Sequence, residues 1–291
     1  MKTQFALAAA LGLIASGSAS AALITDNFEV DSSANYTVVS SDGDNTSTFA
    51  FDYVAAGIPL APRSNPGDTS GLKFTANDND GSSSAITAFH NTAVAGAPGY
   101  KVTVDVWMNF VGTSGTTEYA NIGVSGDGAT ANSIFLPIAG SGMFHSFTGD
   151  GGSGSDHRWF LDSANGGPLT VPGSDPSYLA GSANGTAALY QGIFPEPENT
   201  VAGSPGNNWV TVELTVNQGS VQVAYNGTTV IDGVYTGSLD GLMSLGYADV
   251  FSSVSLPENF GVYDNLVVEV VPEPASAALL GLAGLALTRR R

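Results

Sequence analysis

The chain contains no cysteine, so no disulfide can staple the fold. Cations are almost as scarce, because eight Lys and Arg stand against 26 Asp and Glu in 291 residues. Half of the eight lie at the two ends, and residues 22–270 keep four cations against 25 acids, a net charge of −21. Such a surface repels nucleic acid and anionic lipid, which makes both poor candidates as partners. It favours divalent cations and neutral or cationic polymers.

Helical periodicity is also missing. Between the two ends, no stretch places apolar residues at helical spacing over three turns. Glycine occurs 37 times, and Ser, Thr, Asn and Asp separate short runs rich in Val, Tyr and Phe. This pattern predicts many short strands joined by turns, as in an all-β sandwich or barrel. No linker or repeat divides residues 22–270, so we expect a single domain there.

Alternation of apolar and polar side chains is clearest over residues 100–110. The even-numbered residues form the apolar face, and Trp107 lies on the opposite, more polar face. Asn226-Gly227 separates two alternating runs and predicts a hairpin, because both residues tolerate a positive φ. Residues 139–205 show no regular pattern and are expected to be irregular. The other expected strands are 36–40, 48–54, 72–76, 85–90, 118–124, 133–138, 209–216, 221–225, 228–231 and 260–270.

The first 21 residues have the pattern of a secretory signal peptide. Met1-Lys2 supplies a positive start, residues 5–14 an apolar core, and Ala19-Ser20-Ala21 a small-residue cleavage site. We therefore expect a signal peptidase to cut between Ala21 and Ala22. The remainder of the chain would then lie outside the inner membrane.

The last 21 residues carry a second processing pattern. Pro272-Glu273-Pro274 precedes an apolar run over residues 275–287, and the chain stops on Arg289-Arg290-Arg291. The prolines keep the backbone extended, the apolar run enters the bilayer, and the arginines stay on its cytoplasmic side. A helix over the apolar run rises only ~20 Å, short of the ~30 Å hydrocarbon core. The length favours transient membrane insertion over the alternative, a permanent tail anchor.

This order of elements resembles the PEP-CTERM sorting signal of Gram-negative bacteria. The resemblance implies that a membrane exosortase reads and removes residues 271–291. It also implies that the protein works at the cell surface or in the extracellular matrix. Exosortase systems are associated with exopolysaccharide production, so the resemblance points to extracellular polysaccharide as a partner.

A second resemblance concerns residues 23–270. The opening Asp26-Asn27-Phe28, the strand from Trp209, the Asn226-Gly227 hairpin and the closing segment 262–266 are similar in layout to the concanavalin A-like lectin/glucanase jelly roll, including its laminin-G-like members. The resemblance implies a two-sheet antiparallel sandwich whose first and last strands pair. An immunoglobulin-like tandem is the alternative architecture.

The same resemblance implies a structural calcium ion. Many jelly rolls of this superfamily hold one with an acid near the first strand and another on the last strand, the places of Asp26 and Asp264. Calcium takes six to eight oxygen ligands, commonly from carboxylates and carbonyls. The alternative for each Asp is a turn cap or a bond to a backbone amide.

Catalytic patterns are absent from the sequence. A glycosidase needs two carboxylates flanking the scissile bond, and the laminarinase-type spacing Glu-x-Asp-x-x-Glu does not occur. The three histidines, at positions 90, 145 and 157, form no His-x-x-x-His motif. We therefore expect a protein that is not an enzyme.

Candidate glycan-binding residues lie in two places. The glycine-rich segment 149–155 leads into Asp156, Arg158 and Trp159, which combine an aromatic platform with planar hydrogen-bonding groups. Trp107 is a second candidate platform. The structural alternative is that Arg158 pairs with a nearby Asp while Trp159 lies in the core.

Three functions remain after these exclusions. The favoured hypothesis is an exported, non-catalytic surface or matrix protein that binds or organises extracellular polysaccharide. The second is a glycoside hydrolase or polysaccharide lyase with an unrecognised site. The third is a structural surface protein without a ligand.

Overall fold

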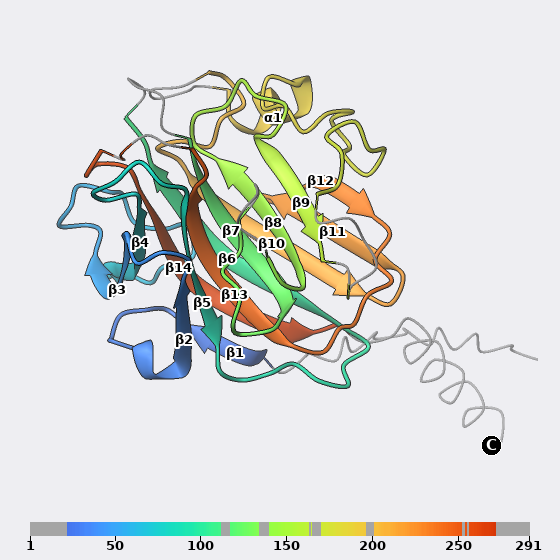
Figure 1. Ribbon diagram of the computed structural model, residues 1–291, viewed down its shortest axis with the longest axis horizontal. Helices are drawn as coiled ribbons and strands as arrows, with labels where there is room; N and C mark the ends of the chain where they lie inside the picture. The colour runs from blue at the N-terminus through green and yellow to red at the C-terminus, as the bar shows by residue number, and fades with distance from the viewer. Residues whose placement is uncertain are drawn as a thin grey trace, which may run out of the picture.

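The computed structural model describes residues 22–271 apart from 112–116, 134–139, 163, 165–169, 196–200, 252–253 and 255. Its strands form two antiparallel sheets that lie face to face (Figure 1). Sheet A has the order β12-β11-β10-β6-β14-β4-β3, and β1 also pairs with β14. Sheet B has the order β2-β5-β13-β7-β8-β9. The fold is the expected two-sheet antiparallel jelly-roll sandwich, and the alternative of an immunoglobulin-like tandem is wrong.

Sheet A consists of β1 (Ala22–Asp26), β3 (Asn45–Asp52), β4 (Ser70–Ala76), β6 (Gly99–Asn109), β10 (Trp209–Asn217), β11 (Ser220–Tyr225), β12 (Thr228–Gly233) and β14 (Phe260–Val270). Sheet B consists of β2 (Tyr36–Ser40), β5 (Ser84–His90), β7 (Glu118–Gly126), β8 (Met143–Thr148), β9 (His157–Leu161) and β13 (Leu242–Asp249). A 3-10 turn, η1 (Ser33–Asn35), and a short helix, α1 (Ala188–Ile193), complete these elements.

The alternation in β6 places its apolar face in the core, as expected. The even-numbered residues from Tyr100 to Met108 are buried in the cluster between the two sheets. The opposite face is not open to water. Segment 53–69 crosses it and packs Tyr53 and Ile58 into a second apolar cluster that contains Trp107. The outer face of sheet A is therefore covered near Trp107.

The first and last strands pair, as the jelly-roll resemblance implies. Ala22 of β1 lies opposite Glu269 of β14, and Val270 lies opposite Tyr100 of β6. The segments with the predicted signal peptide and sorting signal, residues 1–21 and 272–291, lie outside the described residues. In the part of the chain that the structure describes, no helix has the length and apolarity to cross a membrane.

Most predicted strands are confirmed within a few residues, and Asn226 and Gly227 have φ angles of 50° and 80° in the predicted hairpin turn. The prediction of an irregular segment over 139–205 is wrong in part, since β8, β9 and α1 lie there. β13 was not predicted. The expected strand 133–138 falls, except for its first residue, outside the described residues.

Candidate functional site

Two tryptophans lie side by side at one end of sheet A. Trp107 on β6 is opposite Trp209 on β10, and their ring centroids are 5.8 Å apart at an angle of 57°. Trp107 is 8% exposed, whereas Trp209 is half-buried. The indole N–H of Trp209 donates to the carbonyl of Pro59 at 2.7 Å, which fixes the ring. Of the two rings, Trp209 presents the larger exposed aromatic surface, and Trp107 packs beside it.

The two indoles border an open hollow of about 630 Å³. Strand ends β6 and β10 and the segment before β14 surround it. Its lining combines aromatic rings, amides and one carboxylate, the mixture that sugar-binding sites use. The lining residues are Pro59, Trp107, Asn109, Phe110, Val111, Asn207, Asn208, Trp209 and Glu258. We call this site the tryptophan hollow.

Side-chain amides hold the wall of the tryptophan hollow in place. The Asn207 side chain accepts a hydrogen bond from the Phe110 N–H at 2.9 Å and donates to the Phe110 carbonyl at 2.8 Å. Asn109 donates to the Glu258 carbonyl at 2.6 Å and accepts from the Trp107 indole at 3.1 Å. Asn207 has a φ of 56°, which asparagine tolerates better than most residues. The segments flanking the hollow are therefore cross-linked by hydrogen bonds.

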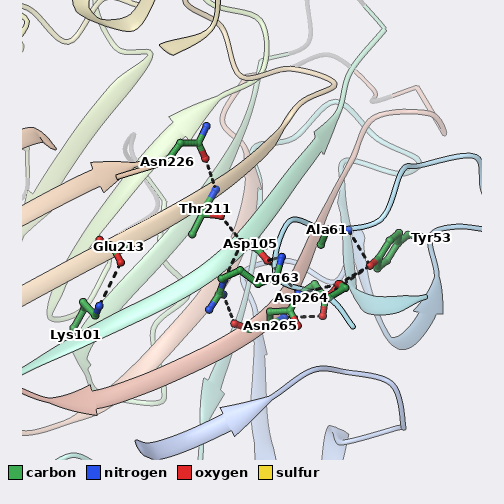
Figure 2. A network of polar contacts seen from close by, with 11 residues as sticks. Tyr53, Ala61, Arg63, Lys101, Asp105, Thr211, Glu213, Asn226, Asp264 and Asn265 are labelled. Carbon is green, nitrogen blue, oxygen red and sulfur yellow. Dashed lines mark hydrogen bonds and ion pairs between the residues drawn. The ribbon is translucent and has the colours of Figure 1, made fainter. Parts of the chain in front are cut away.

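Beneath segment 53–69 lies a buried charge network (Figure 2). Asp105 and Asp264 are opposite each other on β6 and β14 and are fully buried. Arg63 binds Asp105 through Nε at 3.1 Å and donates to the carbonyl of Asn265. Asp264 accepts hydrogen bonds from Tyr53 at 3.0 Å and from a serine hydroxyl at 2.8 Å. Burial, opposed by these hydrogen bonds, raises the pKa of Asp264 to about 6.

A bulge at Asn265 aims neighbouring side chains at this network. Asn265 has a φ of 55°, and the pairing of β14 with β6 slips there by one residue. Asp264 and Asn265 consequently both face outward, where Asn265 donates to Asp105 at 3.1 Å. The bulge explains why β14 can hold two polar residues side by side. Arg63 is the cation of this cluster, so its role is to attach segment 53–69 to sheet A.

The predicted calcium pair is not brought together. Asp26 lies opposite Leu266, a core residue, and accepts hydrogen bonds from the Tyr36 hydroxyl at 3.0 Å and the Phe28 N–H at 2.9 Å. Asp264 faces the other side of sheet A. The carboxylates of Asp26 and Asp264 therefore face opposite sides of sheet A and do not meet at one site. Among the described residues, no group of three or more His, Cys, Asp and Glu is arranged to hold a metal.

The predicted glycan-binding residues Asp156, Arg158 and Trp159 lie in three different environments. Asp156 is fully buried and accepts backbone N–H groups of Ser153 and Gly185, and burial raises its pKa to about 7. Arg158 donates to the Val171 carbonyl at 2.7 Å. Trp159 is 3% exposed and borders a second hollow, which is lined by residues of β9, β12 and segment 171–177. Asp156 and Arg158 thus brace loops, and only Trp159 lines a hollow.

Two histidines meet a tyrosine in the core. His145 Nε2 and His157 Nδ1 hydrogen-bond the Tyr225 hydroxyl at 2.5 and 3.1 Å. His157 also stacks on Tyr190 with a centroid separation of 4.0 Å. Burial lowers the pKa of both histidines to about 3. Both imidazoles are therefore neutral at physiological pH.

Comparison with known proteins identifies no family. No family model matches the chain, and no curated protein matches it. Solved structures resemble it only distantly. A Bacillus subtilis protein of unknown function with a galectin-like fold is 12% identical, with 86% of this chain and 96% of that chain covered and a TM-score of 0.47. The carbohydrate-binding module CBM66 from Bacillus subtilis is 11% identical, with coverage of 68% and 86% and a TM-score of 0.38. The VIP36 exoplasmic/lumenal domain, in its Ca²⁺/Man2-bound form, is 9% identical, with coverage of 88% and 90% and a TM-score of 0.46.

Proposed function

We propose that the protein is exported and binds extracellular polysaccharide at the tryptophan hollow without cleaving it. The observation that carries the proposal is the pairing of Trp107 and Trp209 beside a hydrogen-bonded amide wall. The apolar faces of sugar rings stack on indoles, and their hydroxyls bond to amides and carboxylates. The net charge of −21 over residues 22–270 favours a neutral or cationic polysaccharide.

The carboxylates of the molecule favour binding over hydrolysis. Hydrolysis of a glycosidic bond uses two carboxyl groups about 5–9 Å apart across the bound sugar. Of the described residues lining the tryptophan hollow, only Glu258 carries a carboxylate. Asp105 and Asp264, which face each other on β6 and β14, are fully buried beneath segment 53–69, where Arg63 binds Asp105 and the Tyr53 hydroxyl donates to Asp264. A binding protein fits this arrangement better than a hydrolase.

Export is proposed from the two ends of the chain. The signal-peptide pattern before Ala22 and the sorting pattern from Pro272 to Arg291 are the supporting observations. Intact-mass measurement of the protein released by a Gram-negative host with an exosortase should give a chain that starts at Ala22 and lacks the apolar tail. A chain that keeps residues 1–21 and 275–291 would contradict the export proposal.

Replacing Trp209 should abolish most polysaccharide binding. Trp209→Ala removes the more exposed indole of the pair, and we expect affinity in gel electrophoresis or calorimetry to fall roughly 10- to 100-fold. Trp209→Phe should lose less, since it keeps an aromatic ring and the packing on Tyr53. Val234→Ala, a change of similar chemistry at the 70% exposed edge of the second hollow, should bind as the unchanged protein does.

Tests on the same polysaccharides distinguish the other two functions, an enzyme and a ligand-free surface protein. Release of reducing ends or unsaturated products from a polysaccharide would support the hydrolase or lyase. Absence of binding to every neutral and cationic polysaccharide tested would leave the ligand-free surface protein. Loss of binding in Val234→Ala but not in Trp209→Ala would move the site to the second hollow.

A further inference from the structure

The hydrogen-bond donors around the tryptophan hollow are turned toward the protein itself. The Trp209 indole N–H donates to the Pro59 carbonyl, and the Trp107 indole N–H donates to the Asn109 side chain. Each of the three asparagines in the lining donates a proton of its amide to a backbone carbonyl. The hollow therefore presents acceptors more readily than donors, so a ligand rich in N–H and O–H groups fits it best.

The carboxylate in the lining of the hollow has no cation beside it. Glu258 is exposed, and none of the described lining residues is Lys, Arg or His. The four Lys and Arg of residues 22–270 are all described, and each is engaged elsewhere. Arg63 and Lys101 pair with other acids, Arg158 donates to a backbone carbonyl, and Lys73 lies over two phenylalanine rings. A positively charged ligand would thus meet a carboxylate that no described Lys or Arg neutralises.

The aromatic cluster behind the hollow already holds one ammonium group. Lys73 Nζ lies 4.2 Å from the ring centroid of Phe260 and 4.9 Å from that of Phe51. Phe260 belongs to the apolar cluster that contains Trp107, and Trp209 packs against the same cluster. Ring faces attract cations, and tryptophan does so most strongly. The accessible part of the Trp209 ring is therefore a second place where an ammonium group is favoured.

We propose that the tryptophan hollow selects a polysaccharide with free amino groups, in which an amino-sugar unit lies on Trp209 and places its ammonium at Glu258. Such selection rests on the proposed function, since it names the sugar class that the same hollow takes. Acetylation of the amine removes its charge, so an N-acetylated sugar loses both the ion pair and the attraction of the ammonium to the ring. The net charge of −21 over residues 22–270 also attracts a polycation from a distance.

Calorimetry with two matched oligosaccharides tests this selection. At about pH 6 and low salt, the protein should bind a glucosamine hexamer roughly 10-fold more tightly than an N-acetylglucosamine hexamer. Raising the salt to about 0.5 M should weaken binding of the amine hexamer more than that of the acetylated one, because salt screens exposed charges. Glu258→Gln should reduce the preference to roughly 2-fold, the part that the ring and the overall charge supply. Trp209→Ala should weaken binding of both hexamers.

Asp232→Asn is the matched control. Asp232 is an exposed acid that lines the second hollow, so this variant loses the same charge as Glu258→Gln and should keep the preference. Equal affinity for the two hexamers, an unchanged preference in Glu258→Gln, or a preference lost equally in Asp232→Asn overturns the selection of amino sugars. A lysine hexapeptide that binds as tightly as the glucosamine hexamer would assign the hollow to basic proteins instead. Binding of a neutral polysaccharide but of neither hexamer overturns the selection alone, whereas the absence of any binding contradicts the proposed function as well.

Discussion

Acidification from pH 7 to pH 4.5 is expected to remove about 5 kcal/mol from the free energy of unfolding through His145 and His157. Both imidazoles are buried and have pKa values of about 3 in the folded protein, against about 6.5 in the unfolded chain. Above pH 6.5 neither state binds the proton, so the pair has no effect. As the pH falls below 6.5, only the unfolded chain takes up protons, and stability is lost continuously until about pH 3.

Urea unfolding at pH 7 and pH 4.5 measures this loss when it is compared among variants. His145→Gln or His157→Gln removes one titrating group, so the drop between the two pH values should be about 3 kcal/mol smaller in each. Comparison with the unchanged protein is needed because Asp156 and Asp264 oppose the effect. Burial raises the pKa of Asp156 to about 7 and of Asp264 to about 6. Protonation of these two acids therefore stabilises the folded protein over the same pH range.

His90 provides the control for the histidine series. Its ring is half-buried at the surface and packs edge-on against Tyr36, and burial lowers its pKa to a smaller extent. His90→Gln should therefore change the pH dependence less than either core replacement. Equal pH dependence in the unchanged protein and in both core variants would show that the core imidazoles are not excluded from water.

Removal of Arg63 is the second large effect. Arg63→Met leaves Asp105 and Asp264 facing each other in the buried network without a cation, and we expect a loss of about 3–5 kcal/mol in the free energy of unfolding. Arg63 is partly exposed, with 29% of its side chain accessible, which favours the lower end of that range. Urea unfolding at pH 7.5, above the pKa of about 6 of Asp264, measures the loss.

Lys101→Met is the control, since Lys101 also pairs with two acids, Glu213 at 3.3 Å and Glu269 at 3.9 Å. Those partners are about one third exposed, so the loss should stay below about 1 kcal/mol. Adding Asp264→Asn to Arg63→Met should restore part of the lost stability, because it removes one of the two uncompensated charges. Equal losses in Arg63→Met and Lys101→Met would mean that water reaches the network.

Local patterns predicted the strands that have one apolar and one polar face. The alternation in residues 100–110 and the Asn226-Gly227 turn depend on neighbouring residues only, and both are confirmed. β8 and β13 were missed because both of their faces are buried, which removes alternation: every residue of Met143–Thr148 is buried. Alternation alone does not distinguish a strand covered on both sides from other short apolar runs, although β7, which is also buried throughout, was predicted.

The candidate site was predicted only in part for a different reason. Trp107 was recognised as a platform, but Trp209 becomes its partner only because β10 pairs with β6 across about a hundred residues of sequence. Asp264 was assigned to calcium through the jelly-roll resemblance, whereas its place opposite Asp105 in the buried network depends on the pairing of β14 with β6.

β6 runs from the end of the sandwich near Val271 to the end that carries the tryptophan pair. The strand begins at Gly99, whose carbonyl accepts the N–H of Val271, and it reaches Trp107 eight residues later, roughly 26 Å away at about 3.3 Å per residue. Any continuation of the chain beyond Val271 thus departs from the end of the sandwich remote from the tryptophans. If that continuation attached the protein to a surface, Trp107 and Trp209 would lie at the end of the sandwich remote from the attachment point. The pair would then be accessible to polymer chains in the surrounding medium.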